Sequence, residues 1–362
     1  MITLIPTEYY SAVFYFALFL IIVVSLLKLL ERGYVINNPK KKKYGSLLLL
    51  FSLTLYIGLR PVDPLFVDME TYNSIFEAYA SGSIELLLDY DILWQFFIKT
   101  CSSFFTAQFF FLLCALIYII PLYLASKKWL GVNHYFLFLM FIASFSFWSY
   151  GVNGIRNGIS TSLFVLALSS TKKKYFKYGL FVISYYVHAS LIIPLAAFVL
   201  TLFFKNPKHY FYGWLLCIPL SLVLGSFFEA FFGNIGFQED RLSYLTQGNV
   251  NNDYFSYTGF RWDFLAYSSS ATIVGYYFII KKKFNDKIYI QVFNIYLAVN
   301  GFWILVIRAN FSNRFAYLSW FLIAFVIFYP FFKARFFKNQ NRVLAGFISA
   351  YFAVTYFLYL IF

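Results

Sequence analysis

Charge is scarce in this chain: Asp, Glu, Lys and Arg together make up 12% of its 362 residues, whereas hydrophobic residues make up 61%. Because about a quarter of the residues in a typical soluble domain are charged, a soluble fold is excluded. The apolar runs are continuous and do not alternate with polar residues, which excludes an outer-membrane β-barrel. The composition therefore predicts an all-α, polytopic integral membrane protein.

Sequence signatures of metal, nucleotide and serine-nucleophile chemistry are also missing. The three cysteines are scattered, and neither they nor the three histidines show metal-ligand spacing. The chain contains no P-loop, no HExxH, no GxSxG and no dinucleotide-binding glycine pattern. We therefore expect neither a metal nor a cofactor. Glycine and proline are too sparse to mark a linker, so residues 1–362 are expected to form a single transmembrane domain.

Lysine is concentrated in short runs that follow apolar segments, at residues 40–43, 172–174 and 281–283. Positively charged short loops stay on the cytoplasmic side of a membrane. This orientation leaves two loops, residues 61–103 and 233–262, on the outer side. The lysine runs also account for the net charge of +14, so we expect no nucleic-acid partner.

About ten apolar segments are predicted to span the membrane. They are Tyr9–Leu30, Gly45–Arg60, Phe104–Ser126, His134–Tyr150, Ile155–Thr171, Tyr212–Phe232, Asp263–Ile280, Ile288–Ile307, Asn313–Phe332 and Val343–Ile361. One further segment, Tyr178–Phe204, has lysines near both ends, which predicts a re-entrant helical hairpin with its tip near His188. A plain span is the alternative for this segment.

The first outer loop contains apolar residues at helical spacing, which predicts amphipathic helices lying at the membrane interface. These residues are Ile84, Leu87, Leu88, Ile92, Leu93, Phe96 and Phe97.

Six of the nine arginines fall on the predicted outer side of the membrane. They are Arg60, Arg156, Arg241, Arg261, Arg308 and Arg314. A guanidinium binds phosphate or carboxylate through a two-pronged hydrogen-bonded fork, which lysine cannot form. The distribution therefore predicts that the protein handles an anion on its outer face.

Three of these arginines occupy positions that favour a ligand. Arg156 opens a predicted span next to several glycines, which leave the backbone accessible to a large molecule. Arg308 and Arg314 flank a short turn, from which both are expected to reach one pyrophosphate. The alternatives are an Arg156 side chain that extends to lipid headgroups, and a structural ion pair for Arg308 or Arg314.

The order of these elements resembles the EpsG-like branch of the Wzy-type polysaccharide polymerases. The elements that carry the resemblance are Arg60, Asp68–Tyr72, Arg156-Asn157, Lys172–Lys177, Val187–Ser190 and Asn313–Tyr317. The chain departs from the family pattern at two points, because Val67 precedes Asp68 with no glycine and Asn157 stands where the family has glutamine.

The resemblance implies a membrane glycosyltransferase that builds O-antigen, capsule or exopolysaccharide. Such enzymes join oligosaccharide repeat units carried on undecaprenyl pyrophosphate, at the periplasmic or outer face of the bacterial plasma (inner) membrane. The implied partners are the lipid-linked oligosaccharide, the bilayer, a chain-length regulator and a flippase. A lipid-linked oligosaccharide flippase or another membrane transporter is the alternative, although two similar halves would then be expected. A membrane O-acyltransferase is a third option.

Within this interpretation His188, Asp68 and Arg156 are the predicted catalytic residues. Neutral imidazole has an unperturbed pKa of about 6.5, whereas an arginine neighbour makes an aspartate a weaker base. We therefore expect His188 to accept the proton of the acceptor, and Asp68 to hold a sugar hydroxyl or a catalytic arginine. The predicted substrate-binding residues are Arg60, Tyr72, Asn157, Arg241, Arg261, Arg308, Asn313, Arg314 and Tyr317.

Overall fold

The computed structural model describes residues 5–31, 39–87, 91–234, 259–309 and 312–361. Within these ranges the chain is helical and contains no strand, which confirms the all-α prediction. Two compact units are distinguished, one of Met1–His188 with Phe331–Phe362 and the other of Ala189–Pro330. They are called the first unit and the second unit. The single transmembrane domain that composition predicts stays a prediction.

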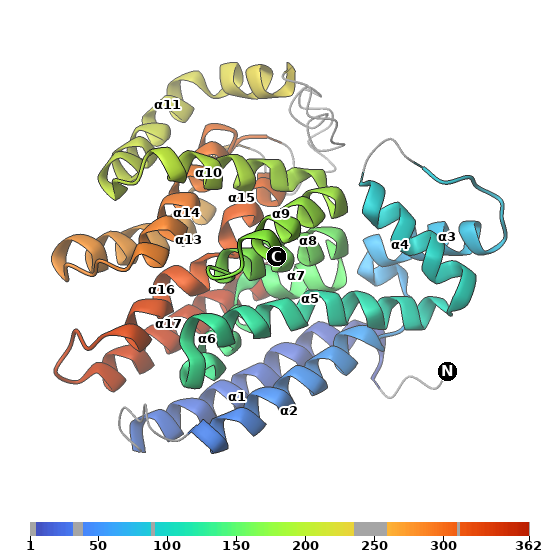
Figure 1. The fold of residues 1–362 in the computed structure, drawn as a ribbon, viewed down its shortest axis with the longest axis horizontal. Helices are drawn as coiled ribbons and strands as arrows, with labels where there is room; N and C mark the ends of the chain where they lie inside the picture. Colours follow the sequence, from blue (N-terminus) through green and yellow to red (C-terminus); the bar gives the residue numbers. More distant parts are fainter. Residues whose placement is uncertain (1–4, 32–38, 88–90, 235–258, 310–311, 362) are drawn as a thin grey trace. The chain divides into compact units, whose positions relative to one another are not determined.

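Most helices of the first unit come from the N-terminal half of the chain (Figure 1). They are α1 (Tyr10–Glu31), α2 (Pro39–Gly58), α3 (Asp68–Ala80), α4 (Ile92–Phe104), α5 (Ala107–Leu130), α6 (His134–Ile142), α7 (Phe145–Val152), α8 (Ile155–Ser169), α9 (Lys174–Val187) and α17 (Gln340–Ile361). The second unit contains α10 (Ile192–Phe203), α11 (Pro207–Asn234), α13 (Trp262–Tyr276), α14 (Lys287–Leu305), α15 (Ser312–Trp320) and most of α16 (Ile323–Lys333).

Helix α5 forms the centre of the first unit and packs against α2, α6 and α8. A Cβ atom at Gly58 would lie 2.8 Å from the Cα atom of Leu112, so only glycine permits the crossing of α2 and α5. Small residues allow helix backbones to approach in this way where lipid provides no hydrophobic driving force. At the edge of the unit α1 packs on α17, with the rings of Tyr15 and Tyr359 stacked at 4.1 Å.

One asparagine ties together four helices of the second unit. The side chain of Asn300 on α14 accepts a hydrogen bond from Trp214 of α11 at 2.7 Å. It donates to Ser268 of α13 at 3.1 Å and to Ser319 of α15 at 2.9 Å. All four residues are buried, so this network pairs polar groups that would otherwise be costly in an apolar interior.

Among the described residues, six helical segments are long and apolar enough to cross a membrane, and they identify a multi-pass membrane protein. They are Thr7–Glu31, Ala107–Ile142, Pro207–Phe232, Lys287–Leu305, Ser312–Lys333 and Gln340–Ile361. One predicted span is interrupted. The segment at His134–Tyr150 divides into α6 and α7 near Ser144, whose hydroxyl donates to the carbonyl of Phe141. The predicted span at Asn313–Phe332 corresponds to α15 and α16, which together form the segment Ser312–Lys333.

The helix break predicted at His188 is confirmed. Helix α9 ends at Val187, and His188 adopts an extended backbone with φ −156° and ψ 118°. Helices α9 and α10 contain 14 and 12 residues, whereas a crossing needs about 20. Because α9 and α10 belong to different units, the re-entrant hairpin itself stays a prediction.

The first outer loop contains two helices, but one lies at a different place from the prediction. Helix α4 includes Leu93 and Phe96, as expected, whereas Ile84 lies in an irregular stretch. The other helix is α3, which ends before Gly82, a residue with a positive φ of 70°. Glycine adopts this backbone conformation without steric cost, so it stops the helix and moves the following apolar residues out of it.

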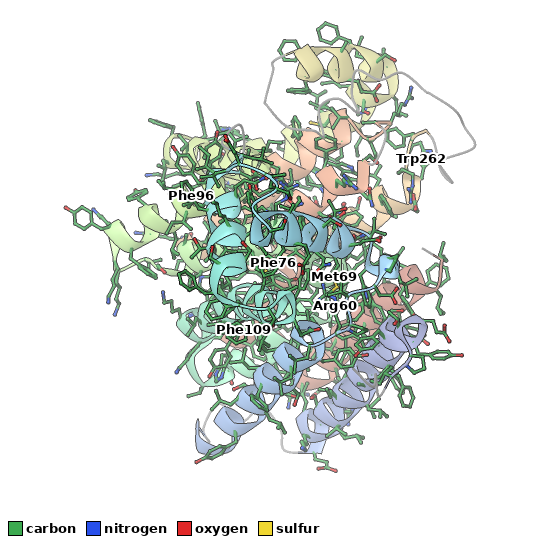
Figure 2. The ribbon with its side chains drawn as sticks, turned by 90° about the vertical axis from the view of Figure 1, so that its right-hand side faces the viewer. Arg60, Met69, Phe76, Phe96, Phe109 and Trp262 are labelled. Atoms are coloured by element: carbon green, nitrogen blue, oxygen red, sulfur yellow. The ribbon has the colours of Figure 1, made fainter. Side chains whose placement is uncertain are left out.

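Helix α3 packs against α4 and α5 through a stripe of large side chains. Met69, Tyr72, Phe76 and Tyr79 are all buried on this face, and Figure 2 labels Met69 and Phe76 on it. The Tyr79 hydroxyl donates to the side chain of Gln95 on α4 at 3.0 Å. The loop is therefore a packed helical layer, which can hold polar side chains at defined positions.

Candidate functional site

Asp91 is the centre of a buried polar cluster in the first unit. Its backbone is left-handed, with φ 50° and ψ 44°, a conformation that aspartate tolerates better than most residues. Its carbonyl accepts hydrogen bonds from the first turn of α4, at Trp94 and Gln95. Its side chain is 3% exposed, and atom Oδ2 meets Arg156 of α8 and His188 at the end of α9. Three separate parts of the chain therefore converge on one carboxylate.

Arg156 forms the most strongly connected ion pair of this cluster. Its Nη1 donates to Asp91 Oδ2 at 2.7 Å, and its Nε donates to the hydroxyl of Tyr72 at 3.0 Å. The guanidinium also lies 5.6 Å from the centroid of the Tyr72 ring. Its side chain nevertheless remains 21% exposed. The arrangement holds the guanidinium rigidly and leaves part of it accessible.

The start of α8 places Arg156 against the interior. Arg156 is the second residue of the helix, and Gly158 is the fourth. A Cβ atom at Gly158 would clash with the Tyr150 carbonyl group, which lies in the last turn of α7. At Gly158 the close approach is therefore made by the protein's own backbone, and the predicted approach of a large ligand to the neighbouring glycines stays a prediction. Asn157, between Arg156 and Gly158, is buried.

His188 contributes an imidazole to the cluster through its Nδ1 atom, which lies 2.9 Å from Asp91 Oδ2. Its side chain is 8% exposed. A carboxylate accepts hydrogen bonds and an imidazole nitrogen can donate one, so this contact assigns the donor role to Nδ1–H. In the neutral ring Nε2 is then the nitrogen that can accept a proton.

Tyr72 and Asp68 lie one turn apart on α3, which confirms that they share a helix face. Burial raises the pKa of the Tyr72 phenol, against the opposing effect of Arg156. The phenol therefore keeps its proton near neutral pH. Asp68 is half-buried, and its backbone N–H donates to the side chain of Asn153 at 3.0 Å. This bond attaches the start of α3 to the turn that precedes α8.

Arg60 lies apart from this cluster and is 1% exposed. Its guanidinium donates to the carbonyls of Ile57 and Val152 and lies near the Phe66 and Phe111 rings. These contacts join the end of α2 to the end of α7. The geometry therefore favours a structural role for Arg60 over the predicted contact with substrate.

The other predicted arginines belong to the second unit, where Arg261 and Arg308 have separate partners. Arg261 forms a two-pronged pair with Asp263, with contacts of 2.9 and 2.6 Å. Arg308 is exposed and donates to the carbonyl of Leu222 at 3.3 Å. Arg241 lies outside the described residues.

The late element of the sequence pattern begins α15. Asn313 and Arg314 are half-buried in its first turn, and Tyr317 is buried one turn later. The described parts of the chain do not place the second unit relative to the first. A common site for Arg156 and Arg314 therefore stays a prediction.

The sequence interpretation brought Arg156, Tyr72 and His188 into one hypothesis, and the structure places them in one cluster. The sequence pattern assigned no role to Asp91. One feature of the sequence could have drawn attention to Asp91, because this residue directly precedes the apolar residues that open α4. Within the described residues, no group of three His, Cys, Asp or Glu side chains could hold a metal ion.

Comparison with known proteins identifies one family. The family model described as EpsG family matches residues 43–362, which include the whole cluster around Asp91. No curated protein and no solved structure matches the chain.

Proposed function

Because this chain belongs to the EpsG family, a group of polysaccharide polymerase-like membrane proteins, we propose that it polymerises lipid-linked oligosaccharide repeat units. The proposed donor is an oligosaccharide on undecaprenyl pyrophosphate, and the proposed location is the outer face of the bacterial plasma membrane. The product would be O-antigen, capsule or exopolysaccharide. The chain would be a glycosyltransferase that needs no soluble energy source, because the lipid-linked bond is already activated.

The cluster of Arg156, Asp91 and His188 is the observation that supports this proposal. Glycosyl transfer to a hydroxyl needs a group that stabilises the departing anion and a group that accepts the hydroxyl proton. A partly exposed guanidinium and a nearly buried imidazole meet on one carboxylate here. These are the two functions that the reaction requires, held a few ångströms apart.

In the proposed reaction the hydroxyl oxygen of the acceptor sugar attacks the anomeric carbon of the donor chain. Its proton passes to Nε2 of His188. The bond between the anomeric carbon and the pyrophosphate oxygen breaks, and its electron pair leaves with the lipid pyrophosphate. Arg156 stabilises this charge, for which a guanidinium fork is suited. The Tyr72 hydroxyl and the Asp91 carboxylate fix the orientation of the fork.

The apolar surroundings of a membrane protein also explain why Arg156 needs Asp91 as a charge partner. An isolated guanidinium close to the hydrocarbon is costly, and pairing lowers that cost. When the pyrophosphate arrives, it replaces part of the hydration of an arginine that is already oriented. Prior orientation reduces the entropy that binding would otherwise lose.

Deletion of the gene in its host tests the proposed reaction. A polymerase deletion is expected to leave single repeat units on the carrier or on the final acceptor, visible as one short species on a gel. Loss of all surface repeat units would instead identify a flippase and contradict the proposal. The matched control is restoration of long polymer by the wild-type gene on a plasmid.

A further inference from the structure

The role of Asp91 is the feature that neither the sequence pattern nor the family match assigns. One carboxylate oxygen, Oδ2, makes two contacts: it lies 2.7 Å from Arg156 Nη1 and 2.9 Å from His188 Nδ1. At 3% exposure the carboxylate is more deeply buried than either partner. A buried carboxylate that was not ionised would leave the guanidinium without its charge partner, so the contact favours the ionised form.

An ionised carboxylate determines which nitrogen of His188 carries the proton. The carboxylate has no hydrogen to donate, so Nδ1 must be the donor across the 2.9 Å contact. An isolated neutral imidazole exchanges its proton between the two nitrogens, and a hydrogen bond to one of them selects a tautomer. Asp91 thus selects the tautomer that keeps Nε2 able to accept a proton.

The charges on the neighbouring elements favour a neutral imidazole that is ready to accept a proton. Helix α9 packs against α8 and α4. The charged residue of α8 is Arg156, and α4 carries the exposed Lys99 and is preceded by Asp91. Arg156 already compensates the charge of Asp91, so His188 need not be protonated to balance it. On α3, Asp68 lies close enough to act electrostatically on Arg156.

We propose that Asp91 is a positioning residue, which holds His188 in the Nδ1-protonated tautomer and holds Arg156 in place through the same oxygen atom. This inference rests on the proposed function for its catalytic meaning, but the tautomer itself does not depend on any activity. It assigns Asp91 no contact with substrate. It predicts that one substitution at Asp91 disturbs both groups together.

Nitrogen NMR of the purified full-length protein tests the tautomer directly. The chain has three histidines, so the signals of His188 are those that disappear in His188→Gln. We expect the wild-type spectrum to show protonated Nδ1 and unprotonated Nε2 for this residue at neutral pH. An Nε2-protonated ring in the wild-type protein would overturn the proposal, whatever the activity of the enzyme.

Asp91→Asn is the matching variant, because the amide keeps the shape of the side chain but loses its charge. We expect its His188 signals to move away from the Nδ1-protonated form, and turnover to fall by about 10²–10⁴-fold. Unchanged His188 signals would contradict the proposal. Asp63→Asn is the control, since Asp63 lies in the same outer loop and only caps a short helix through Leu65. The control variant should retain the wild-type spectrum and turnover.

The double variant Asp91→Asn/His188→Ala separates this inference from the proposed function. If Asp91 acts through His188, losing Asp91 should cost little more once His188 is gone. The turnover of the double variant should then fall below that of His188→Ala only by the part that comes from a misplaced Arg156. A correct tautomer together with wild-type turnover in Asp91→Asn would leave the tautomer assignment intact and contradict the proposed catalytic use of His188.

Discussion

At the scale of single residues, the guanidinium of Arg156 makes two simultaneous contacts that an ammonium cannot reproduce. Its Nε reaches Tyr72 while its Nη1 reaches Asp91. In Arg156→Lys the charge remains, but a single nitrogen can no longer serve both partners and a pyrophosphate oxygen. We therefore expect polymer length to be sharply reduced at normal protein level, measured on gels of surface polysaccharide.

Arg335→Lys is the control for this substitution. Arg335 is exposed and donates to the carbonyl of Lys338, far along the chain from the cluster. It should give polymer of normal length. Full-length polymer from Arg156→Lys would contradict the assignment of Arg156 to the leaving group.

Substitutions of His188 and Asp68 are expected to reduce the reaction rate in different ways. His188→Ala removes the proposed proton acceptor, so turnover by the purified protein should fall at least about 100-fold while the lipid-linked substrate still binds. Asp68→Asn should instead weaken the use of acceptor, and a higher acceptor concentration should partly restore the rate. Near-normal turnover by His188→Ala would remove the imidazole from the mechanism and leave Asp68 as the candidate base.

At the scale of secondary-structure elements, the junction between α7 and α8 determines where Arg156 lies. Gly158→Ala would force its Cβ against the backbone of Tyr150, which a side-chain movement cannot relieve. Overpacking of this kind costs about 1–3 kcal/mol. We expect a lower thermal unfolding temperature together with shorter polymer, because the displaced helix start moves Arg156 away from Asp91.

Gly346→Ala is the matched control for the glycine prediction. Gly346 lies within α17, and a Cβ atom there meets nothing within 4 Å. Alanine favours a helix more than glycine by up to about 1 kcal/mol, so this variant should be unchanged or slightly more stable. Equal behaviour of the two variants would show that the α7–α8 junction does not control the position of Arg156.

At the scale of the whole molecule, the lysine runs predict which side of the membrane faces the cytoplasm. Glu85 and Lys172 are both exposed, the first in the predicted outer loop and the second in the predicted inner turn. A membrane-impermeant thiol reagent should label Glu85→Cys in intact cells and should label Lys172→Cys only after the membrane is opened. The wild-type protein, with its three native cysteines, provides the background.

Reversed labelling would place the Asp91 cluster on the cytoplasmic side. That result would contradict the proposed outer location of the reaction. It would leave the geometry of the cluster unchanged, so the two conclusions can be tested separately.

The sequence by itself determined the class of the protein, its helical composition and three members of the cluster. Long apolar runs can satisfy their backbone hydrogen bonds in lipid as helices, so composition and run length suffice for that prediction. Arg156, Tyr72 and His188 were recognised because charged and titratable groups are rare in such a chain and occur in an ordered pattern.

Only the tertiary structure decided how those residues are used. Asp91 is 65 positions from Arg156 and 97 from His188, and no local pattern reports contacts over such distances. The tertiary structure also directs Arg60 inward, onto the backbone carbonyls of Ile57 and Val152, although the sequence grouped it with five other arginines on the predicted outer side. The physical reason is that helical periodicity specifies which face of a helix is buried, whereas partners across helices depend on how the helices pack.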